Sequence, residues 1–179
     1  REIPVVAPLA LNGATLHLHS GFRFAVYPKQ GGRMPEFDRA DTLLRMGRFL
    51  GRIHAVGAQT DFLHRPTLDL ETFGHASRDF LRSGNWLPSD LGAAWDSVVE
   101  HALASVAHCY ERAGQVCAIR LHGDCHAGNV LWTEAGPHFV DFDDCRTGPA
   151  VQDLWMLLSG EREEMEAQLR EVLTGYEDF

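Results

Sequence analysis

The sequence predicts an α+β fold, in which a mostly helical body carries a small β element. Three observations support this class. Apolar residues recur with a period of about 3.6 over long segments, as in amphipathic helices, whereas alternation of apolar and polar residues is confined to short runs. These short runs gather near the start of the chain and again in its second half, instead of alternating regularly with the helical segments.

Composition places the chain among globular proteins. Of the 179 residues, 45% are hydrophobic, and no apolar run approaches the roughly 18 residues that span a bilayer. The polar start of the chain is unlike a signal peptide, and the net charge of −9 disfavours a nucleic-acid partner. We therefore expect a soluble cytoplasmic protein without nucleic-acid or membrane partners. We also expect a monomer, because nothing in the sequence resembles a coiled-coil seam.

The first third of the chain is predicted to contain a hairpin, a linker and a helix. Residues 15–27 alternate apolar and polar side chains around a His-Ser-Gly turn, which predicts a β-hairpin. Proline and glycine in residues 29–37 predict a linker. The helix should run from Asp38, as its N-cap, to Gly57, where it stops. Its apolar stripe is expected to consist of Leu43, Met46, Leu50 and Ile53.

The remainder of the chain combines longer helices with short strands. A strand is expected at 116–121, and a hairpin of two short strands at 129–142. Pro149 should start a largely buried helix. The helices predicted from this part of the sequence lie at 67–82, 89–112, 149–158 and 161–176.

One segment concentrates polar chemistry: Leu-His-Gly-Asp-Cys-His-Ala-Gly-Asn-Val-Leu-Trp-Thr at 121–133. Asp124 and Asn129 lie on its loop, and Asp141 follows at the end of the next strand, so a hairpin can bring the three side chains together. The oxygens of Asn129 and Asp141 suit a hard cation such as Mg²⁺, which also takes ligands from phosphates. Asp124 could then orient a hydroxyl group and accept its proton.

Two other interpretations of this segment remain open. His122, Asp124 and His126, with Cys125, could form the metal site of a metal-dependent hydrolase. Alternatively, the chain is a catalytically silent binding module. The remaining histidines, His54 among them, are scattered along the sequence and are expected to be ordinary polar or partly buried residues.

The motifs resemble those of a known enzyme family. His-Gly-Asp at 122–124 with Asn129 is similar to the catalytic loop H-R-D-x-x-x-x-N of protein kinases, with the same interval from Asp to Asn. Val-Asp-Phe-Asp-Asp at 140–144 resembles the D-F-G strand end that holds magnesium in those kinases. The form H-G-D-x-H-x-x-N followed by D-F-D-D is closer to the aminoglycoside phosphotransferase and choline kinase branch. Within that branch, nearly the whole chain resembles a bacterial Ser/Thr protein kinase.

The resemblance implies a protein-kinase-like fold and an ATP- and Mg²⁺-dependent kinase that acts on a Ser or Thr hydroxyl of a protein. A kinase of a small-molecule hydroxyl, of the aminoglycoside, homoserine or choline type, is the alternative. By the resemblance, Asp124 is the catalytic base, Asn129 and Asp141 bind magnesium, and Asp141 also counts as a catalytic residue. Asp153 would brace the loop through backbone N–H groups. The hinge that hydrogen-bonds adenine would be Val26, Tyr27 and Pro28.

The resemblance also divides the chain. Residues 1–28 would be the end of an N-terminal lobe with its hinge strand, and 29–37 a linker. Residues 38–179 would form a helical C-terminal lobe, with the catalytic loop at 121–133 and the metal-binding strand at 138–144. No glycine-rich phosphate loop precedes the hinge. No lysine precedes it either, because the chain's one lysine follows the hinge. Phosphoryl transfer depends on neutralising the charge of the phosphates. We therefore expect this chain to be part of a longer kinase and to be inactive alone.

Two positions depart from the protein-kinase pattern. Gly123 replaces the Arg that, in loop-phosphorylated kinases, pairs with a phosphate, and Asp143 replaces the Gly after Phe142. Activation by loop phosphorylation is therefore not expected. Asp143 and Asp144 could hold a cationic substrate or remain solvated, and the sequence favours neither.

Overall fold

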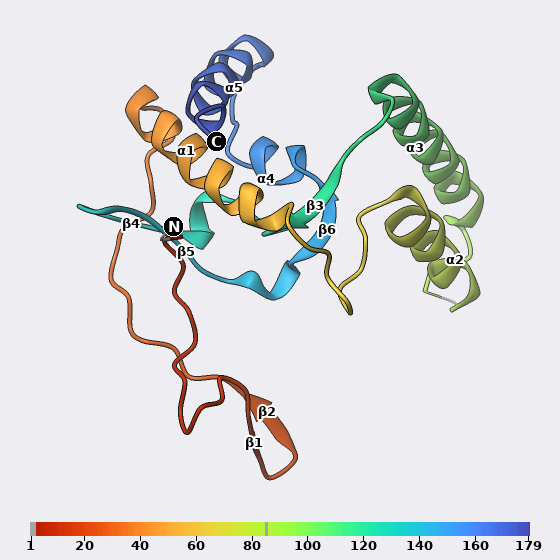
Figure 1. The fold of residues 1–179 in the computed structure, drawn as a ribbon. Helices are drawn as coiled ribbons and strands as arrows, with labels where there is room; N and C mark the ends of the chain where they lie inside the picture. Colours follow the sequence, from red (N-terminus) through yellow and green to blue (C-terminus); the bar gives the residue numbers. More distant parts are fainter. Residues whose placement is uncertain (1–2, 85) are drawn as a thin grey trace.

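A computed structural model describes residues 3–84 and 86–179 and contains both helices and strands, which confirms the predicted α+β class. Figure 1 shows a central body from which two projections extend: the hairpin β1–β2 and the helix pair α2–α3. The body holds the helices α1, α4 and α5 and the strands β3 to β6. Residues 1 and 2 of the expected segment 1–28 lie outside the described ranges, as does residue 85.

The core of the body is built on α1 (Ala40–Gly57) and α5 (Arg162–Tyr176), which pack against each other along their length. Glycines allow this close approach. A Cβ on Gly47 would lie 1.9 Å from the carbonyl oxygen of Val172, so any larger side chain would separate the helices. The stripe predicted for α1 is buried: Leu43, Met46, Leu50 and Ile53.

The first residues of α1 and α5 differ in how they are capped. α1 begins after Arg39, whose side chain makes no capping bond, so the prediction of Asp38 as N-cap is wrong. α5 begins after Glu161, which forms a capping box with Glu164. A capping side chain therefore marks the start of α5 in the sequence, whereas no side-chain cap marks the start of α1.

Two short antiparallel strand pairs carry the polar segment. β4 (Val130–Thr133) pairs with β5 (Gly136–Phe139), which confirms the predicted hairpin. β3 (Ala118–Leu121) pairs with β6 (Arg146–Pro149). The sequence did not indicate β6, because Arg-Thr-Gly-Pro lacks apolar alternation. These pairings bring the loop after β3 next to the segment that joins β5 to β6.

α4 (Val151–Trp155) is shorter than predicted. Pro149 ends β6 instead of opening the helix, so that part of the prediction is wrong. Of the five residues of α4, Asp153 and Leu154 are buried, which also corrects the expectation of a largely buried helix. Asp153, together with Gln152, connects α4 to the loop that follows β3.

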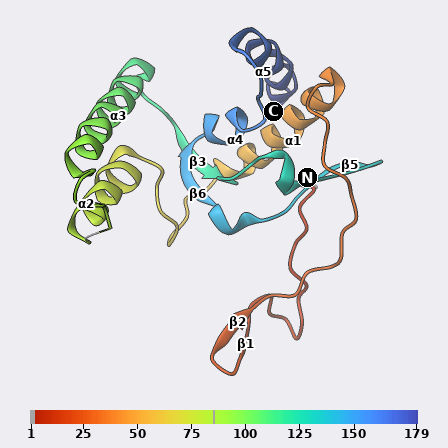
Figure 2. The same ribbon diagram turned by 180° about the vertical axis from the view of Figure 1, so that it is seen from behind.

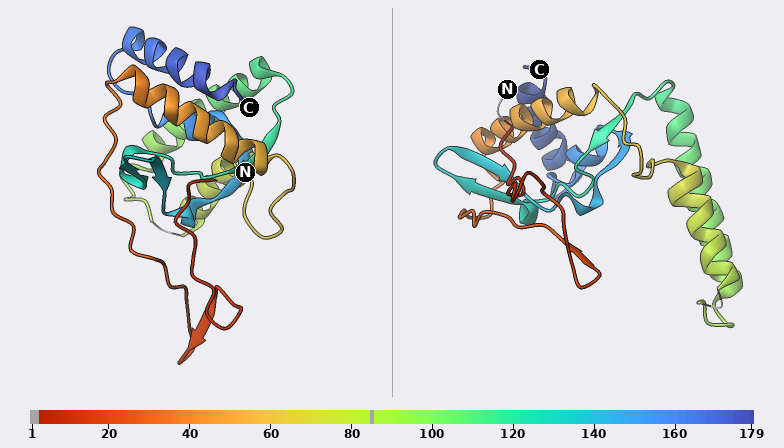
Figure 3. Two further views of the ribbon diagram at one scale, coloured as in Figure 1. Left: turned by 60° about the vertical axis from the view of Figure 1, so that its left-hand side comes forward. Right: turned by 60° about the horizontal axis from the view of Figure 1, so that its bottom comes forward.

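α2 (Ala76–Ser83) and α3 (Gly92–Ala113) form an arm that extends from the body (Figure 3). α3 ends at Gly114 as predicted, yet none of its residues is buried. Val98, on its apolar stripe, is 68% exposed. The helical period therefore predicted the element correctly without showing what covers it. No described helix combines the length and the apolar character needed to cross a membrane.

A π-helical turn (Leu70–His75) precedes α2 and starts later than the helix predicted at 67–82. Thr67 forms a bridge to Thr147 of β6, which keeps the chain extended there. The turn then begins after Asp69, whose carboxylate accepts the N–H of Thr72 at 2.7 Å. The loop after α1 is thus fixed to the body before the arm begins.

β1 (His17–His19) and β2 (Phe22–Phe24) form the hairpin predicted near the start of the chain. Figure 2 shows that this hairpin extends away from the body. The segment that precedes the hairpin lies against the body, where Val6 N–H donates to the carbonyl oxygen of Phe139 at 3.1 Å. The hairpin leaves several apolar side chains exposed: Leu18, Phe22 and Phe24.

Candidate functional site

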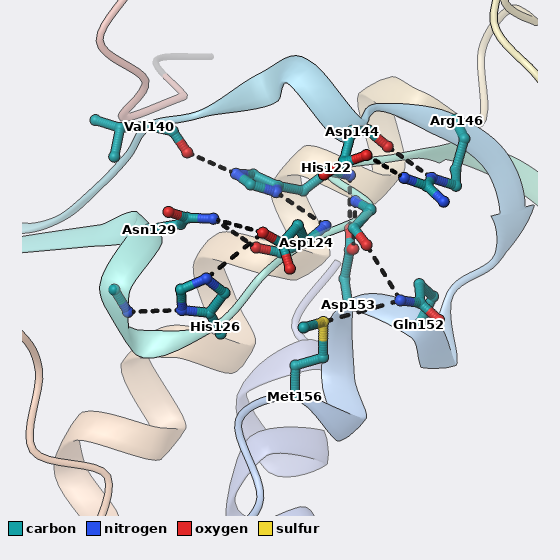
Figure 4. Close-up of polar contacts among 12 residues, drawn as sticks. His122, Asp124, His126, Asn129, Val140, Asp144, Arg146, Gln152, Asp153 and Met156 are labelled. Atoms are coloured by element: carbon teal, nitrogen blue, oxygen red, sulfur yellow. Dashed lines mark hydrogen bonds and ion pairs between the residues drawn. The ribbon is translucent and has the colours of Figure 1, made fainter.

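The loop that follows β3 is held by side chains of α4. The carboxylate of Asp153 accepts the backbone N–H groups of His122 and Gly123, both at 2.8 Å. Gln152 donates from Nε2 to the carbonyl oxygen of Gly123 at 3.1 Å. Figure 4 shows these contacts meeting at the loop. Asp153 is fully buried, so water does not compete for these bonds, and the brace expected of this residue is present.

His122 is buried and uses both ring nitrogens within the fold. Its Nε2 donates to the carbonyl oxygen of Val140 at 2.8 Å, and its Nδ1 accepts the N–H of Asp124 at 3.4 Å. A carbonyl oxygen only accepts, so these bonds select the neutral tautomer with its proton on Nε2. The ring also contacts Phe142, with 4.5 Å between centroids. His122 therefore ties the loop to the segment around residue 141.

Gly123 occupies a position that excludes any side chain. Its φ is +90°, a conformation that glycine adopts readily. A Cβ there would lie 2.1 Å from the carbonyl oxygen of Asp144. Close packing of these two segments therefore explains why glycine stands where many protein kinases have arginine.

The carboxylate of Asp124 is oriented by two neighbours. Asn129 donates from Nδ2 to the backbone oxygen of Asp124 at 2.9 Å and to its Oδ2 at 3.1 Å. His126 Nε2 lies 3.5 Å from the same Oδ2. His126 Nδ1 accepts the N–H of Gly128 at 3.0 Å, which leaves the ring proton on Nε2, facing Asp124. Both contacts use Oδ2, and the side chain is 34% exposed, so Oδ1 can face an incoming hydroxyl group.

Asp141 lies beside Asn129 because the β4–β5 hairpin closes there. The N–H of Val140, one residue before Asp141, donates to the carbonyl oxygen of Asn129 at 3.1 Å. Asp141 has a φ of 61°, in the left-handed region, which costs a residue other than glycine on the order of 1 kcal/mol. Non-glycine residues held in this conformation occur preferentially at functional sites. The backbone thus presents the exposed carboxylate of Asp141 to an adjoining cavity.

The two predicted magnesium ligands fit a hard cation. Asn129 directs Nδ2 at Asp124, so its Oδ1 points away from that carboxylate. The carboxylate of Asp141 offers a second oxygen donor. The hydrogen bond between Val140 N–H and the carbonyl oxygen of Asn129 holds the two segments that carry these donors together. Mg²⁺ prefers such donors and completes its shell with water and phosphate oxygens. The donor set therefore suits Mg²⁺ bound together with a nucleotide.

A cavity of about 740 Å³ opens beside Asp141. Tyr27 and Pro28, two of the three predicted hinge residues, line this cavity. Val26 is absent from its described lining, and the carbonyl oxygen of Val26 accepts the N–H of Leu9 at 2.7 Å. The cavity therefore extends from the expected hinge to the expected metal site.

His54 was not predicted as part of the site. It is 2% exposed, with Nε2 3.0 Å from Asp153 Oδ2 and Nδ1 2.8 Å from the hydroxyl of Tyr176. Burial, and then the charge of Asp153, raise the pKa of Tyr176, which keeps its hydroxyl protonated as a donor. The expectation that His54 is an ordinary polar or partly buried residue is therefore wrong, because it is fully buried and bonded to Asp153. Its spacing of four residues after Leu50 placed it on the buried face of α1 and could have identified it.

The hydrolase interpretation of His122, Asp124 and His126 is wrong. Among the described residues, no group of three or more His, Cys, Asp and Glu side chains is arranged to hold a metal ion. Both nitrogens of His122 are engaged with the backbone, and Nδ1 of His126 accepts from Gly128. Both ring nitrogens of His122 and Nδ1 of His126 therefore hold the loop in place.

The cysteines next to the site are not activated thiols. Burial raises the pKa of Cys125 well above its ordinary value, and nearby Asp153 raises it further. Burial also raises the pKa of Cys145 to about 11, although the guanidinium of Arg65 opposes this shift. Both groups remain protonated near neutral pH, which disfavours a nucleophilic or redox role.

Comparison with known sequences gives consistent matches. A family model described as "Phosphotransferase enzyme family" matches residues 1–179. "Stress response kinase A" of Escherichia coli (strain K12) is 48% identical over 179 residues, 99% of this chain and 53% of that protein. "Serine/threonine protein kinase RdoA" of Salmonella typhimurium (strain LT2) is 43% identical over 177 residues, again 99% of this chain and 53% of the relative. The chain thus spans about half the length of the curated relatives it matches.

Solved structures share the fold. The amicoumacin kinase hAmiN, in complex with AMP-PNP, Ca²⁺ and Ami, has a TM-score of 0.73 and 19% identity, over 98% of this chain and 57% of that chain. The gentamicin-APH(2")-IIa complex has a TM-score of 0.66 and 15% identity, over 98% and 60%. A microcompartment-associated aminopropanol kinase has a TM-score of 0.66 and 20% identity, over 97% and 59%. These matches confirm the aminoglycoside phosphotransferase-like fold that the motifs implied.

Proposed function

This chain belongs to the phosphotransferase enzyme family, and we propose that it is the catalytic and metal-binding half of an ATP-dependent protein kinase. The observation that carries the proposal is the arrangement around Asn129. Its side chain orients Asp124, and its backbone is bonded to the residue that precedes Asp141. Through Asn129, the candidate base is therefore linked to Asp141, the candidate metal ligand that lines the cavity.

Asp124 would position the acceptor. Its Oδ2 is held by Asn129 and His126, which leaves Oδ1 to accept the proton of a Ser or Thr hydroxyl. The hydroxyl oxygen then bonds to the γ-phosphorus of ATP while the bond from that phosphorus to the bridging oxygen breaks. ADP leaves, and the hydroxyl proton passes to Asp124. Because the phosphoryl transition state is loose, orientation of the hydroxyl is the larger contribution of Asp124.

Asn129 and Asp141 would hold the metal, and Mg²⁺ is the ion that their oxygens suit. When bound, Mg²⁺ neutralises charge on the β- and γ-phosphates. The chain's own contribution is to fix the two donors. Asn129 is fixed by its bonds to Asp124, and Asp141 by the hairpin closure and its left-handed backbone.

The nucleotide would occupy the cavity. The side chains of Leu131 and Val140 line it and offer apolar contact to a purine ring, while Tyr27 lies at the expected hinge. Asp141 lines the same cavity, so a nucleotide with its base near Tyr27 would direct its phosphates toward the metal ligands. This orientation assigns the adenine contact to the backbone at residue 27 and the phosphates to the loop end.

A protein Ser or Thr is the acceptor we propose. The support comes from the relatives named stress response kinase A and serine/threonine protein kinase RdoA, which are 43–48% identical to this chain. The amicoumacin kinase and the aminopropanol kinase of known structure are 19% and 20% identical to this chain, so their likeness supports the fold alone. A small-molecule hydroxyl remains the alternative acceptor.

The test uses a full-length protein that contains this chain. It is given γ-labelled ATP with a casein-like protein and, separately, with a panel of amino-alcohols, with and without Mg²⁺. We expect label on the protein only, no transfer after chelation, and recovery when Mg²⁺ is restored. Asp124→Asn should lower the rate by about a hundredfold or more.

Asp90→Asn is the matched control, because Asp90 is an exposed aspartate outside the site. It should transfer phosphate at the wild-type rate. Label confined to the amino-alcohols would refute the protein acceptor, and wild-type activity in Asp124→Asn would refute the role of Asp124.

A further inference from the structure

The loop between α1 and η1 (Leu70–His75) carries an arginine to the cavity. The carbonyl oxygen of Pro66 accepts the N–H of Thr147 at 3.1 Å, and the N–H of Leu68 donates to the carbonyl oxygen of Thr147 at 2.6 Å. These bonds fix the residues that directly follow Arg65 against β6. The position of Arg65 is therefore set by the fold, although its side chain is exposed.

The guanidinium of Arg65 is anchored close to the candidate metal ligand. Its Nη1 donates to the carbonyl oxygen of Asp143, two residues after Asp141. Arg65, Asp141 and Asp143 line the same cavity. One N–H is used for anchoring, and a guanidinium has five, so several donors remain for an anion.

The charge of the cavity lining makes this arginine important. Among the described residues that line the cavity, Arg65 is the one cationic side chain, whereas Asp141 and Asp143 are acidic. Lys29 follows the hinge but is not part of that lining. Polyphosphate next to two carboxylates requires positive charge, and a planar guanidinium binds phosphate oxygens through paired N–H groups.

We propose that Arg65 is a further substrate-contacting residue, which binds the phosphate oxygens of ATP at the Asp141 end of the cavity. This inference rests on the proposed kinase function. The anchor at Asp143 holds the guanidinium beside the metal site, so that Arg65 and the bound cation would act on the same phosphates. Arg65 would thereby supply positive charge to the phosphates from the end of the cavity that Asp141 and Asp143 line.

Binding of three ligands separates this role from a merely structural one. The full-length protein and its variants are titrated calorimetrically with ATP in the presence of Mg²⁺, with ADP, and with adenosine. Arg65→Met should weaken ATP binding roughly tenfold or more, because charged hydrogen bonds to phosphate are lost, and should leave adenosine binding within about twofold. Arg65→Lys should be intermediate, since lysine keeps the charge and loses the planar fork.

Arg162→Met is the matched control, because Arg162 is a highly exposed arginine on α5, paired only with Glu166 among the described residues. Its affinities should equal those of the wild type. The proposal is overturned if Arg65→Met binds ATP as tightly as this control, or if adenosine is weakened as much as ATP. It is also overturned if Arg65→Met raises only the KM of the acceptor.

The two levels of the proposal fail differently. If the wild-type protein neither binds ATP nor transfers phosphate, the kinase function fails and the role of Arg65 fails with it. If the wild type is an active kinase and Arg65→Met matches Arg162→Met, only the role of Arg65 is refuted. Thermal unfolding of both variants checks that each is folded at the assay temperature.

Discussion

The carboxylate of Asp153 connects three parts of the chain through its bonds. It accepts the N–H groups of His122 and Gly123 on one side and faces the imidazole of His54 on the other. His54 in turn contacts Tyr176 of α5. A buried carboxylate is costly unless its oxygens are satisfied, so the partners of Asp153 are part of the site as much as the residues that face substrate.

We expect His54→Phe to impair catalysis without removing nucleotide binding. The substitution leaves Asp153 with one donor fewer in a buried position, which should cost about 1–3 kcal/mol in the free energy of unfolding. The loop around Asp124 should then be less precisely held, so kcat should fall while the Kd for ATP changes little. Urea denaturation, initial rates and calorimetry on the full-length protein measure these three quantities.

His108→Ala is the control for His54, because His108 is exposed on α3. It should change neither stability nor kcat. His54→Gln, which retains a side-chain N–H, should recover part of both. Equal kcat in the wild type and His54→Phe would show that the brace is dispensable for catalysis.

At the residue scale, the sequence indicated what lies close in the chain and missed what lies far apart. The interval from Asp124 to Asn129 could be predicted because one loop contains both residues. Arg65 could not, because its proximity to Asp143 follows from a bridge between Thr67 and β6, far along the chain. The role of His54 was visible only as a polar residue on an otherwise apolar helical stripe.

The packing of α1 against α5 is the element-scale feature on which the brace depends. Gly175 packs against the backbone of Leu44 and Arg48 in α1, and a Cβ on Gly175 would lie 2.0 Å from the carbonyl oxygen of Leu44. Tyr176 follows directly, so the helix spacing sets the position of its hydroxyl against His54. The glycines at the contact between α1 and α5 thus determine where the hydroxyl of Tyr176 lies relative to His54.

We expect Gly175→Ala to separate the two helices. A methyl group at this contact has no room, so the overpacking should cost roughly 1–3 kcal/mol and lower the Tm by several degrees. The activity should fall as well, because Tyr176 and His54 move together with the helices. Calorimetric unfolding and initial rates test this expectation.

Gly92→Ala provides the comparison, since nothing lies within 4 Å of a Cβ built on Gly92. That variant should be neutral or slightly stabilised, because alanine favours the helix. If Gly175→Ala were as stable as Gly92→Ala, the close helix contact would not be a determinant of stability.

The elements themselves were predicted unevenly, for a physical reason. α1 and α5 have long amphipathic periods, and both were located within two residues of their observed bounds. β6 was missed because its own residues do not favour a strand, and it is extended because it pairs with β3. Pro149 was assigned to a helix start, although it lies at the end of that strand.

At the scale of the whole molecule, both projections from the body leave apolar side chains exposed. The hairpin β1–β2 exposes Leu18 and Phe22, and α3 exposes Val98. The periodicity of α3 predicted a helix but not its cover, since a periodic stripe does not state which element packs on it. The division of the chain at 1–28, 29–37 and 38–179 stays a prediction.

We expect the 179-residue chain alone to be folded but unable to transfer phosphate at a useful rate. It spans about half the length of its curated relatives, and its one lysine, Lys29, follows the expected hinge. Without a phosphate-binding lysine ahead of the hinge, charge on the phosphates is only partly neutralised, and such contributions account for most of phosphoryl-transfer catalysis. The isolated chain should therefore transfer label at below about a thousandth of the full-length rate. Far-UV circular dichroism establishes that it is folded, and a rate within about tenfold of the full-length protein would show that residues 1–179 suffice.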